Sequence, residues 1–141
     1  MRWTASTILL SLGYVACGSA VSEPQPLRIE PGQSISLRPG QVALAADGGL
    51  RFGFEAVTSD SRCPKNVQCV WAGDATVRIW VQRGAGAREV RDLHVATGST
   101  REPPDPGVRL VRLDPVPFAG KTLEPRDYVA TLALAPAAVE R

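Results

Sequence analysis

The sequence predicts an all-β protein: a single antiparallel β-sandwich or a partly open barrel of about seven to nine short strands, with one disulfide-closed loop. A length of 141 residues is enough for one domain. The 13 glycines and 12 prolines favour short elements joined by turns. Several segments alternate apolar and polar residues, which places the apolar side chains on one face of a sheet.

Three segments show the alternation most clearly: residues 50–56, 75–82 and 128–134. In the second, Trp80 falls on the face with the polar residues, opposite Val77 and Ile79. Shorter predicted strands are Leu27–Ile29, Ser34–Leu37, Gln41–Ala45, Glu89–Val95 and Val108–Leu113. Turns rich in Gly and Pro separate these strands, and we expect residues 103–106 and 115–120 to be irregular.

Composition gives little reason to expect nucleic acid or a cofactor. The chain has 16 basic and 14 acidic residues, and a net charge of +2 provides no electrostatic attraction to nucleic acid. We find no phosphate-binding glycine loop, EF-hand or histidine cluster, so we predict neither a cofactor nor a metal site.

The N-terminus has the pattern of a secretory signal peptide, which we place at residues 1–16. Arg2 supplies the positive start, and Ala5–Ala16 contains no charge. As a helix this uncharged segment would span about 18 Å, which is short of the roughly 30 Å hydrocarbon core of a bilayer. The pattern therefore predicts export rather than a stable membrane-spanning helix.

The segment Tyr14-Val15-Ala16-Cys17 resembles the lipobox of bacterial lipoproteins, although Tyr14 stands where leucine is usual. The resemblance implies that Cys17 becomes the first residue and carries a lipid anchor in the membrane. Because residue 18 is Gly and not Asp, it also implies the outer membrane, facing the periplasm. The alternative is ordinary cleavage after Ala20, which would release a soluble periplasmic or secreted protein.

The sequence divides into four predicted segments. After the signal peptide, residues 17–26 are expected to form a flexible tether, because they are small, polar and contain proline. Residues 27–135 are the predicted β-domain, and residues 136–141 are a tail.

The chain contains three cysteines, and assigning Cys17 to the sorting machinery leaves Cys63 and Cys69 free to pair. The oxidising environment outside the cytoplasm, where an exported protein folds, favours a disulfide between them. A loop of seven residues closed in this way gains about 2.4 kcal/mol in the chain-entropy model. The C-x5-C spacing differs from the redox C-x-x-C motif, and with His94 as the only histidine it makes at most half a zinc site.

Residues 60–73 read D-S-R-C-P-K-N-V-Q-C-V-W-A-G. This segment resembles the motif of a functionally uncharacterised family of small bacterial exported proteins and predicted lipoproteins. The resemblance implies export and a β-domain, but no activity and no catalytic residue. The family often has glycine at the position of Asn66, where we expect a left-handed backbone conformation.

Four residues of this motif could form a binding surface: Arg62, Lys65, Gln68 and Trp71. Rigid loops on sheets are good binding platforms, and Trp and Arg are common in binding hot spots. The alternative is structural. Asp60 or Ser61 would then bind a nearby backbone N–H, Arg62 would pair locally, and Trp71 would pack over the disulfide or cap the sandwich.

The sequence favours a non-catalytic cell-envelope protein, tethered or secreted, that presents the disulfide loop to an envelope protein partner. One alternative is a small protease inhibitor, in which a constrained Lys65 enters a trypsin-like pocket. Another is an envelope enzyme with His94 as its general base, although no catalytic motif surrounds this histidine.

Overall fold

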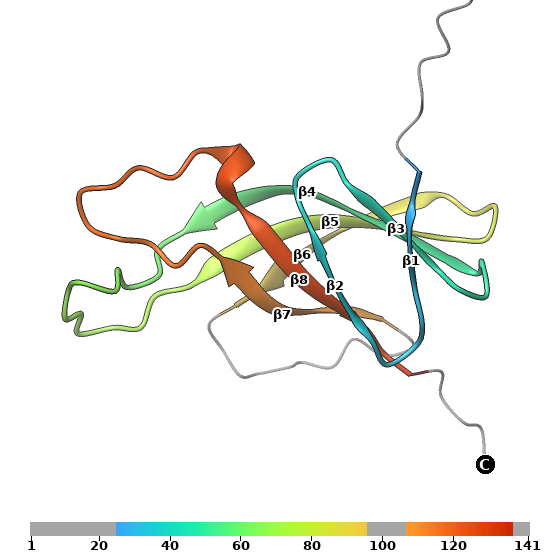
Figure 1. The fold of residues 1–141 in the computed structure, drawn as a ribbon, viewed down its shortest axis with the longest axis horizontal. Coiled ribbons are helices and arrows are strands. Elements are labelled where there is room, and N and C mark those ends of the chain that lie inside the picture. Colours follow the sequence, from blue (N-terminus) through green and yellow to red (C-terminus); the bar gives the residue numbers. More distant parts are fainter. Residues whose placement is uncertain (1–24, 96–106, 137–141) are drawn as a thin grey trace, which may run out of the picture.

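A computed structural model describes residues 25–95 and 107–136, which form eight strands and one short 3-10 helix (Figure 1). The strands are β1 (Leu27–Ile29), β2 (Ser34–Leu37), β3 (Val42–Ala45), β4 (Leu50–Asp60), β5 (Ala75–Arg83), β6 (Arg88–His94), β7 (Val108–Asp114) and β8 (Val129–Leu134). The 3-10 helix covers Pro125–Asp127, immediately before β8. The all-β prediction is confirmed.

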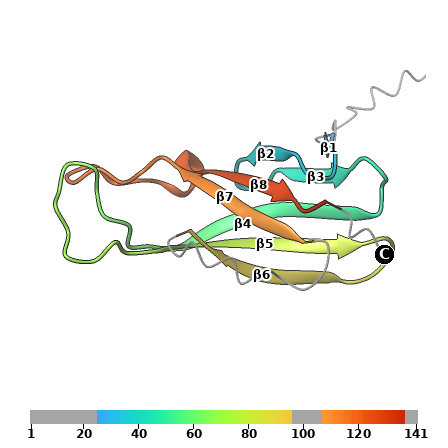
Figure 2. The same cartoon turned by 90° about the horizontal axis from the view of Figure 1, so that it is seen from below.

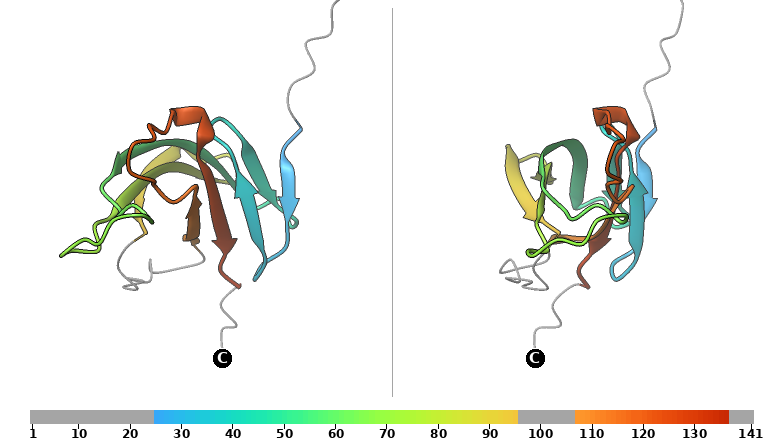
Figure 3. Two further views of the ribbon diagram at one scale, coloured as in Figure 1. Left: turned by 60° about the vertical axis from the view of Figure 1, so that its left-hand side comes forward. Right: turned by 90° about the vertical axis from the view of Figure 1, so that its left-hand side faces the viewer.

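The strands form two sheets that pack against each other (Figure 2). One sheet has the order β1-β3-β4-β5-β6 and the other has the order β2-β8-β7, so the strands do not close into a barrel. The larger sheet curls, which brings β3 beside β2 (Figure 3).

The sandwich is antiparallel, as predicted, except at one pair of strands, β1 and β3, which run parallel. The reason lies in the connection between them. The chain leaves the larger sheet after β1, forms β2 in the other sheet and then returns as β3. Two reversals of direction restore the original one, so β3 runs alongside β1 in the same sense. The remaining pairs are antiparallel.

The core lies between the sheets and comes from the apolar positions of the alternating segments. Phe52 and Phe54 of β4, Ile79 of β5, and Leu132 of β8 are fully buried. Burial of such side chains contributes about 1.5–3 kcal/mol each relative to exposure. The predicted inward faces of residues 50–54, 75–81 and 128–134 are therefore confirmed.

β4 is longer than the alternation predicts, since it continues through residues 57–60. Register shifts between Phe54 and Ala56 and between Val57 and Ser59 interrupt its pairing with β5. Such bulges bend a strand and increase its twist. The extension carries Asp60 to the end of the sandwich, at the base of the disulfide loop.

Trp80 is only 8% exposed, although it lies on the outer face of β5. Its cross-strand partner is Gly53, and a Cβ on Gly53 would come within 2.5 Å of the indole Nε1. The guanidinium carbon of Arg88 lies over the ring, 4.2 Å from its centroid. The ring therefore occupies the space left by a glycine and is covered by a cation–π contact.

Several predictions concern segments outside the described residues. These are the signal peptide at 1–16, the lipidation site Cys17, most of the tether, the irregular segment 103–106 and most of the tail. Within the described residues, no helix is long and apolar enough to cross a membrane.

Candidate functional site

Two long loops extend from the same end of the sandwich (Figure 1). Residues 61–74 connect β4 to β5, and residues 115–124 connect β7 to the 3-10 helix before β8. Figures 1 and 2 show the two loops side by side, beyond the ends of the sheets. We call residues 63–72 and 116–123 together the tip.

Backbone and side-chain hydrogen bonds join the two loops. The backbone N–H of Lys65 donates to the carbonyl of Pro117 at 3.0 Å. The backbone N–H of Ala119 donates to the side-chain oxygen of Asn66 at 2.7 Å. The Asn66 side chain therefore links the two loops, a role that differs from the backbone conformation expected of this residue. The two loops form one joined structure rather than two independent segments.

The predicted disulfide is present within the tip. Cys63 and Cys69 are bonded, with their Cα atoms 5.9 Å apart. Between them the chain makes a tight turn, in which the Val67 N–H donates to the Pro64 carbonyl at 3.1 Å. The Cys63 N–H also donates to the carbonyl of Ala72 at 3.2 Å, which pairs the two arms of the loop.

We expect the double substitution Cys63→Ser and Cys69→Ser to lower the free energy of unfolding by about 2 kcal/mol, because it removes the constraint on the unfolded chain. Urea unfolding followed by circular dichroism measures the change. Wild-type protein treated with a thiol reductant is the matched control and should unfold at the same urea concentration as the double variant. Equal stability of the oxidised wild type and the double variant would contradict a stabilising role.

The base of the disulfide loop is fixed by Arg62, which the structure places inside the protein. Its side chain is 10% exposed, and its Nε and Nη2 atoms donate to the two carboxylate oxygens of Asp60 at 2.8 and 2.7 Å. Nη1 donates to the Leu113 carbonyl at 2.7 Å, and Nη2 also donates to the Pro115 carbonyl at 2.9 Å. The guanidinium therefore links the end of β4 to the end of β7 and the start of the second loop.

Tyr128 completes this cluster, since its hydroxyl donates to Asp60 at 3.1 Å. Burial alone would raise the pKa of Asp60, but the hydrogen bonds and charge of Arg62, with a contribution from Tyr128, outweigh burial and lower this pKa. Burial and the adjacent Asp60 charge raise the pKa of Tyr128. Asp60 is thus held as a carboxylate and Tyr128 as a neutral phenol.

The lowered pKa of Asp60 predicts a loss of stability in acid. The folded state binds this proton more weakly than the unfolded state, so the contribution is present above the unfolded pKa of about 4. It is lost as the pH falls through the folded-state pKa. Urea midpoints measured from pH 5 downward should therefore fall more steeply for the wild type than for Asp60→Asn. Parallel pH profiles for the two proteins would show that Asp60 is not the responsible group.

Gly73 closes the base of the disulfide loop at a point of close backbone approach. Its φ is +66°, and a Cβ built on it would overlap the carbonyl oxygen of Ser61. The Ser61 N–H donates to the Asp74 carbonyl at 2.7 Å beside this contact. Both the backbone angle and the lack of space require glycine here.

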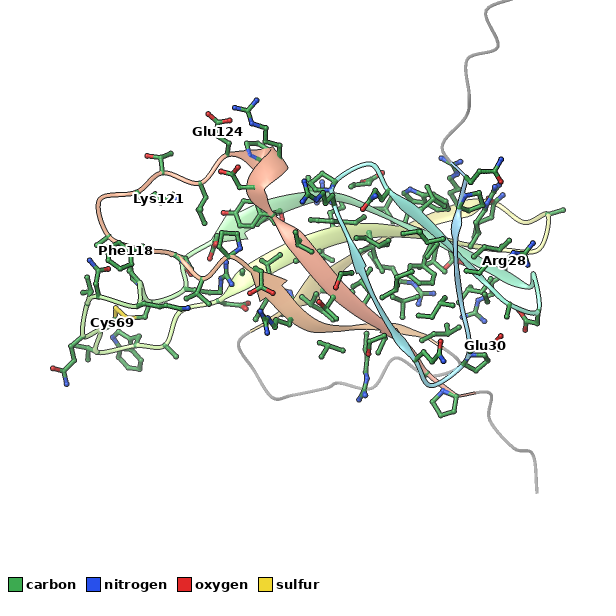
Figure 4. All side chains as sticks on the ribbon, viewed as in Figure 1. Arg28, Glu30, Cys69, Phe118, Lys121 and Glu124 are labelled. Atoms are coloured by element: carbon green, nitrogen blue, oxygen red, sulfur yellow. A yellow bond between two sulfur atoms is a disulfide. The ribbon has the colours of Figure 1, made fainter. Side chains whose placement is uncertain are left out.

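The tip exposes several large apolar side chains. Val70 is 91% exposed and Trp71 is 83% exposed, while Phe118 from the second loop is 51% exposed. Figure 4 shows Phe118 and Cys69 at the projecting end, on adjacent loops. Large aromatic side chains are mostly buried in soluble domains, so this concentration of exposed apolar side chains makes the tip the candidate site.

Three of the four predicted surface residues are exposed in this loop: Lys65, Gln68 and Trp71. The prediction is wrong for Arg62, whose guanidinium is used by Asp60 and by backbone carbonyls. The alternative in which Arg62 pairs locally with Asp60 is correct for these two residues. Trp71, however, neither caps the sandwich nor becomes buried against the disulfide.

Sequence reasoning did not select Val70 or Phe118. Val70 lies between two residues that were considered, and its apolar character in a polar loop was the available signal. Phe118 lies about 50 residues away in the sequence from the disulfide loop, and nothing in the sequence pairs these segments. The structure adds both residues to the surface.

His94 lies at the end of β6 and is exposed. Its Nδ1 atom is 2.7 Å from Asp74 Oδ2 and 3.5 Å from Thr76 Oγ1. In a catalytic triad the acid and the nucleophile contact different ring nitrogens of the histidine. Here both partners face the same nitrogen, so these three residues do not form that arrangement.

A small open pocket of about 220 Å³ is lined by residues of both sheets, among them Ala45, Leu50 and Leu134. Typical ligand pockets are larger, at about 300–1,000 Å³. Within the described part of the chain, no group of three or more His, Cys, Asp or Glu residues could hold a metal ion. Neither observation favours a catalytic centre over the exposed tip as the functional site.

Comparison of the chain with models of protein families, with curated proteins and with solved structures finds no match.

Proposed function

We propose that this protein is a non-catalytic binding module of the bacterial cell envelope that presents the tip to a partner. The observation that carries the proposal is the exposure of Val70 and Trp71 on a loop that is otherwise fixed. These two side chains contribute little to the packing of the domain. Clustered exposed apolar side chains mark contact surfaces on soluble proteins, and this supports contact with another molecule.

The way the loop is fixed supports binding. A disulfide, the Arg62–Asp60 ion pair and hydrogen bonds to the second loop restrict the conformations of the tip before any partner binds. A preorganised surface loses less conformational entropy on binding than a flexible one. Trp71 is well suited to this role because it offers a large area with few rotatable bonds.

The cellular setting belongs to the same proposal. A signal peptide at 1–16 and a lipidated Cys17 would place the domain at the outer membrane, facing the periplasm, and cleavage after Ala20 would leave it soluble. β1 begins at Leu27, toward the end of the molecule opposite the tip (Figure 1). A lipid anchor would therefore attach to one end of the domain and leave the other end accessible.

Protease inhibition receives less support from the geometry of the tip. Proteases bind their substrates as extended segments, whereas Lys65 lies in the tight turn between Pro64 and Val67. Its backbone N–H is also used by Pro117. A binding surface around Trp71 needs no change in this conformation, so we propose it in preference to inhibition.

Site-specific photo-cross-linking in the source bacterium tests the proposed function. A photoreactive amino acid replaces Val70 in the full-length protein, and after illumination the adduct is identified by mass spectrometry. The matched control carries the same group in place of Val90, a residue of β6 that is 60% exposed and lies outside the tip. We expect a reproducible adduct from position 70 that position 90 does not give. Absence of such an adduct, or identical adducts from both positions, would contradict a binding role for the tip.

A further inference from the structure

The charged residues of the tip are all cationic. Residues 63–72 and 116–123 include Lys65 and Lys121 and no aspartate or glutamate. Both lysines are exposed, and neither forms a salt bridge with an acid among the described residues. Arg62, just below the tip, is neutralised by Asp60. A surface of this kind is complementary to an anionic partner.

The apolar side chains of the tip come from both loops. Val67, Val70 and Trp71 belong to the disulfide loop, Phe118 belongs to the second loop, and all four side chains are exposed. Tryptophan is enriched where an apolar layer meets water, because its ring is largely apolar and its N–H needs a polar partner. The tip combines such residues with cations that can contact anionic headgroups.

The shape of the tip also bears on the kind of partner that it can contact. The two loops project beyond the sheets (Figures 2 and 4), so the apolar residues lie on a protrusion. A protein partner would need a groove of matching shape with acidic residues at its rim. A fluid bilayer surface accepts a protruding apolar group without a preformed groove.

We propose that the tip binds the surface of a lipid bilayer containing anionic lipids. Val70 and Trp71 enter the headgroup region, and Lys65 and Lys121 contact anionic headgroups. The proposal rests on the proposed function, because it names the partner of the same surface. It does not depend on lipidation of Cys17, since it concerns the other end of the domain.

The test uses the chain from Val21 onward, which retains every residue the structure describes and removes the acylation site and the apolar N-terminus. Binding is measured by co-sedimentation with vesicles of phosphatidylcholine alone and of equal parts phosphatidylcholine and phosphatidylglycerol. Of the three tryptophans in the sequence, this chain keeps Trp71 and Trp80. Trp80 is already buried, so a blue shift of fluorescence on vesicle addition reports Trp71.

We expect binding and a blue shift with the anionic vesicles and much weaker binding with the neutral ones. Trp71→Ala should reduce the affinity for anionic vesicles about tenfold or more, because it removes a large apolar side chain from the contact. Lys65→Gln and Lys121→Gln should each reduce it about fivefold. Val90→Ala is the matched control, which removes an exposed apolar side chain elsewhere and should leave binding unchanged.

Three outcomes would overturn the proposal: no binding to either vesicle, equal binding to neutral and anionic vesicles, or anionic binding that survives Trp71→Ala. The substituted side chains are exposed, so their replacement should leave the domain folded, and a far-ultraviolet circular dichroism spectrum checks this. Failure of vesicle binding with a protein adduct at position 70 in the cross-linking experiment would leave the binding function standing with a protein partner. Failure of both experiments would remove the binding function itself.

Discussion

Arg62→Ala is expected to lower the free energy of unfolding by about 3 kcal/mol. The substitution leaves the Asp60 carboxylate almost buried, with its side chain 8% exposed and its cationic partner gone. It also removes the hydrogen bonds to the carbonyls of Leu113 and Pro115, which join the two long loops to the sheets. Urea unfolding at neutral pH measures the loss.

The control for this prediction is Arg78→Ala, which breaks an exposed pair with Asp92 and should reduce stability far less. A double-mutant cycle with Asp60→Ala separates the energy of the Arg62–Asp60 ion pair from that of the other hydrogen bonds of Arg62. Because removing both partners leaves no unpaired buried charge, the double variant should lose clearly less than the two single losses added together. Additive losses would contradict a coupled Arg62–Asp60 pair.

Gly73→Ala is expected to cost about 3 kcal/mol and to loosen the disulfide loop. A side chain at this position adopts a strained backbone angle and also overlaps the Ser61 carbonyl oxygen. The two arms of the loop must move apart to accommodate it. Trypsin should then cleave after Lys65 faster than in the wild type, and urea unfolding should report the loss of stability.

Gly120→Ala is the matched control, because Gly120 has a φ of +84° but no atoms within 4 Å of an added Cβ. It carries the strain of the backbone angle without the overlap, so we expect a loss of about 1 kcal/mol. The difference between the two variants then measures the contact with Ser61. Equal losses would show that this contact contributes nothing.

The strands were largely predictable from sequence because their signal is local. Ser34–Leu37 and Leu27–Ile29 are found with the predicted bounds, and Val42–Ala45 begins one residue later than predicted. Alternation of apolar residues with period two shows which face of a strand is buried. This pattern can be read from a few neighbouring residues without knowledge of the rest of the fold. The parallel pairing of β1 with β3 was not predictable in this way, because it depends on the sheet to which β2 belongs.

The two tryptophans show where local patterns stop being informative. Trp80 is on the outer face by alternation, yet it is buried because Gly53 on the adjacent strand leaves room for it. Trp71 was predicted on the binding surface, with packing over the disulfide or against the sandwich as the alternative, and only the three-dimensional structure shows that the ring is exposed. Whether an aromatic ring is covered depends on its cross-strand and cross-loop neighbours, which are distant in sequence.

The candidate site shows the same division. The disulfide followed from cysteine arithmetic and the predicted export, whereas the local pairing of Arg62 was only the alternative to its predicted place on the binding surface. The contacts of Arg62 with Leu113 and Pro115 span about 50 residues, so no local pattern could have revealed them. The same is true of Phe118, whose neighbours Pro117 and Ala119 are hydrogen-bonded to Lys65 and Asn66 of the disulfide loop.

The central claim is that the protein is exported and that a disulfide bond closes its loop. Mass spectrometry tests this most directly, on protein that is isolated from its native cells without reductant and alkylated immediately. We predict a chain that starts at Cys17 with acyl groups attached, or at Val21 without them. In either form, a peptide linking Cys63 to Cys69 should carry no alkylation. Recovery of the whole 141-residue chain with Cys63 and Cys69 both alkylated would contradict both export and the disulfide bond.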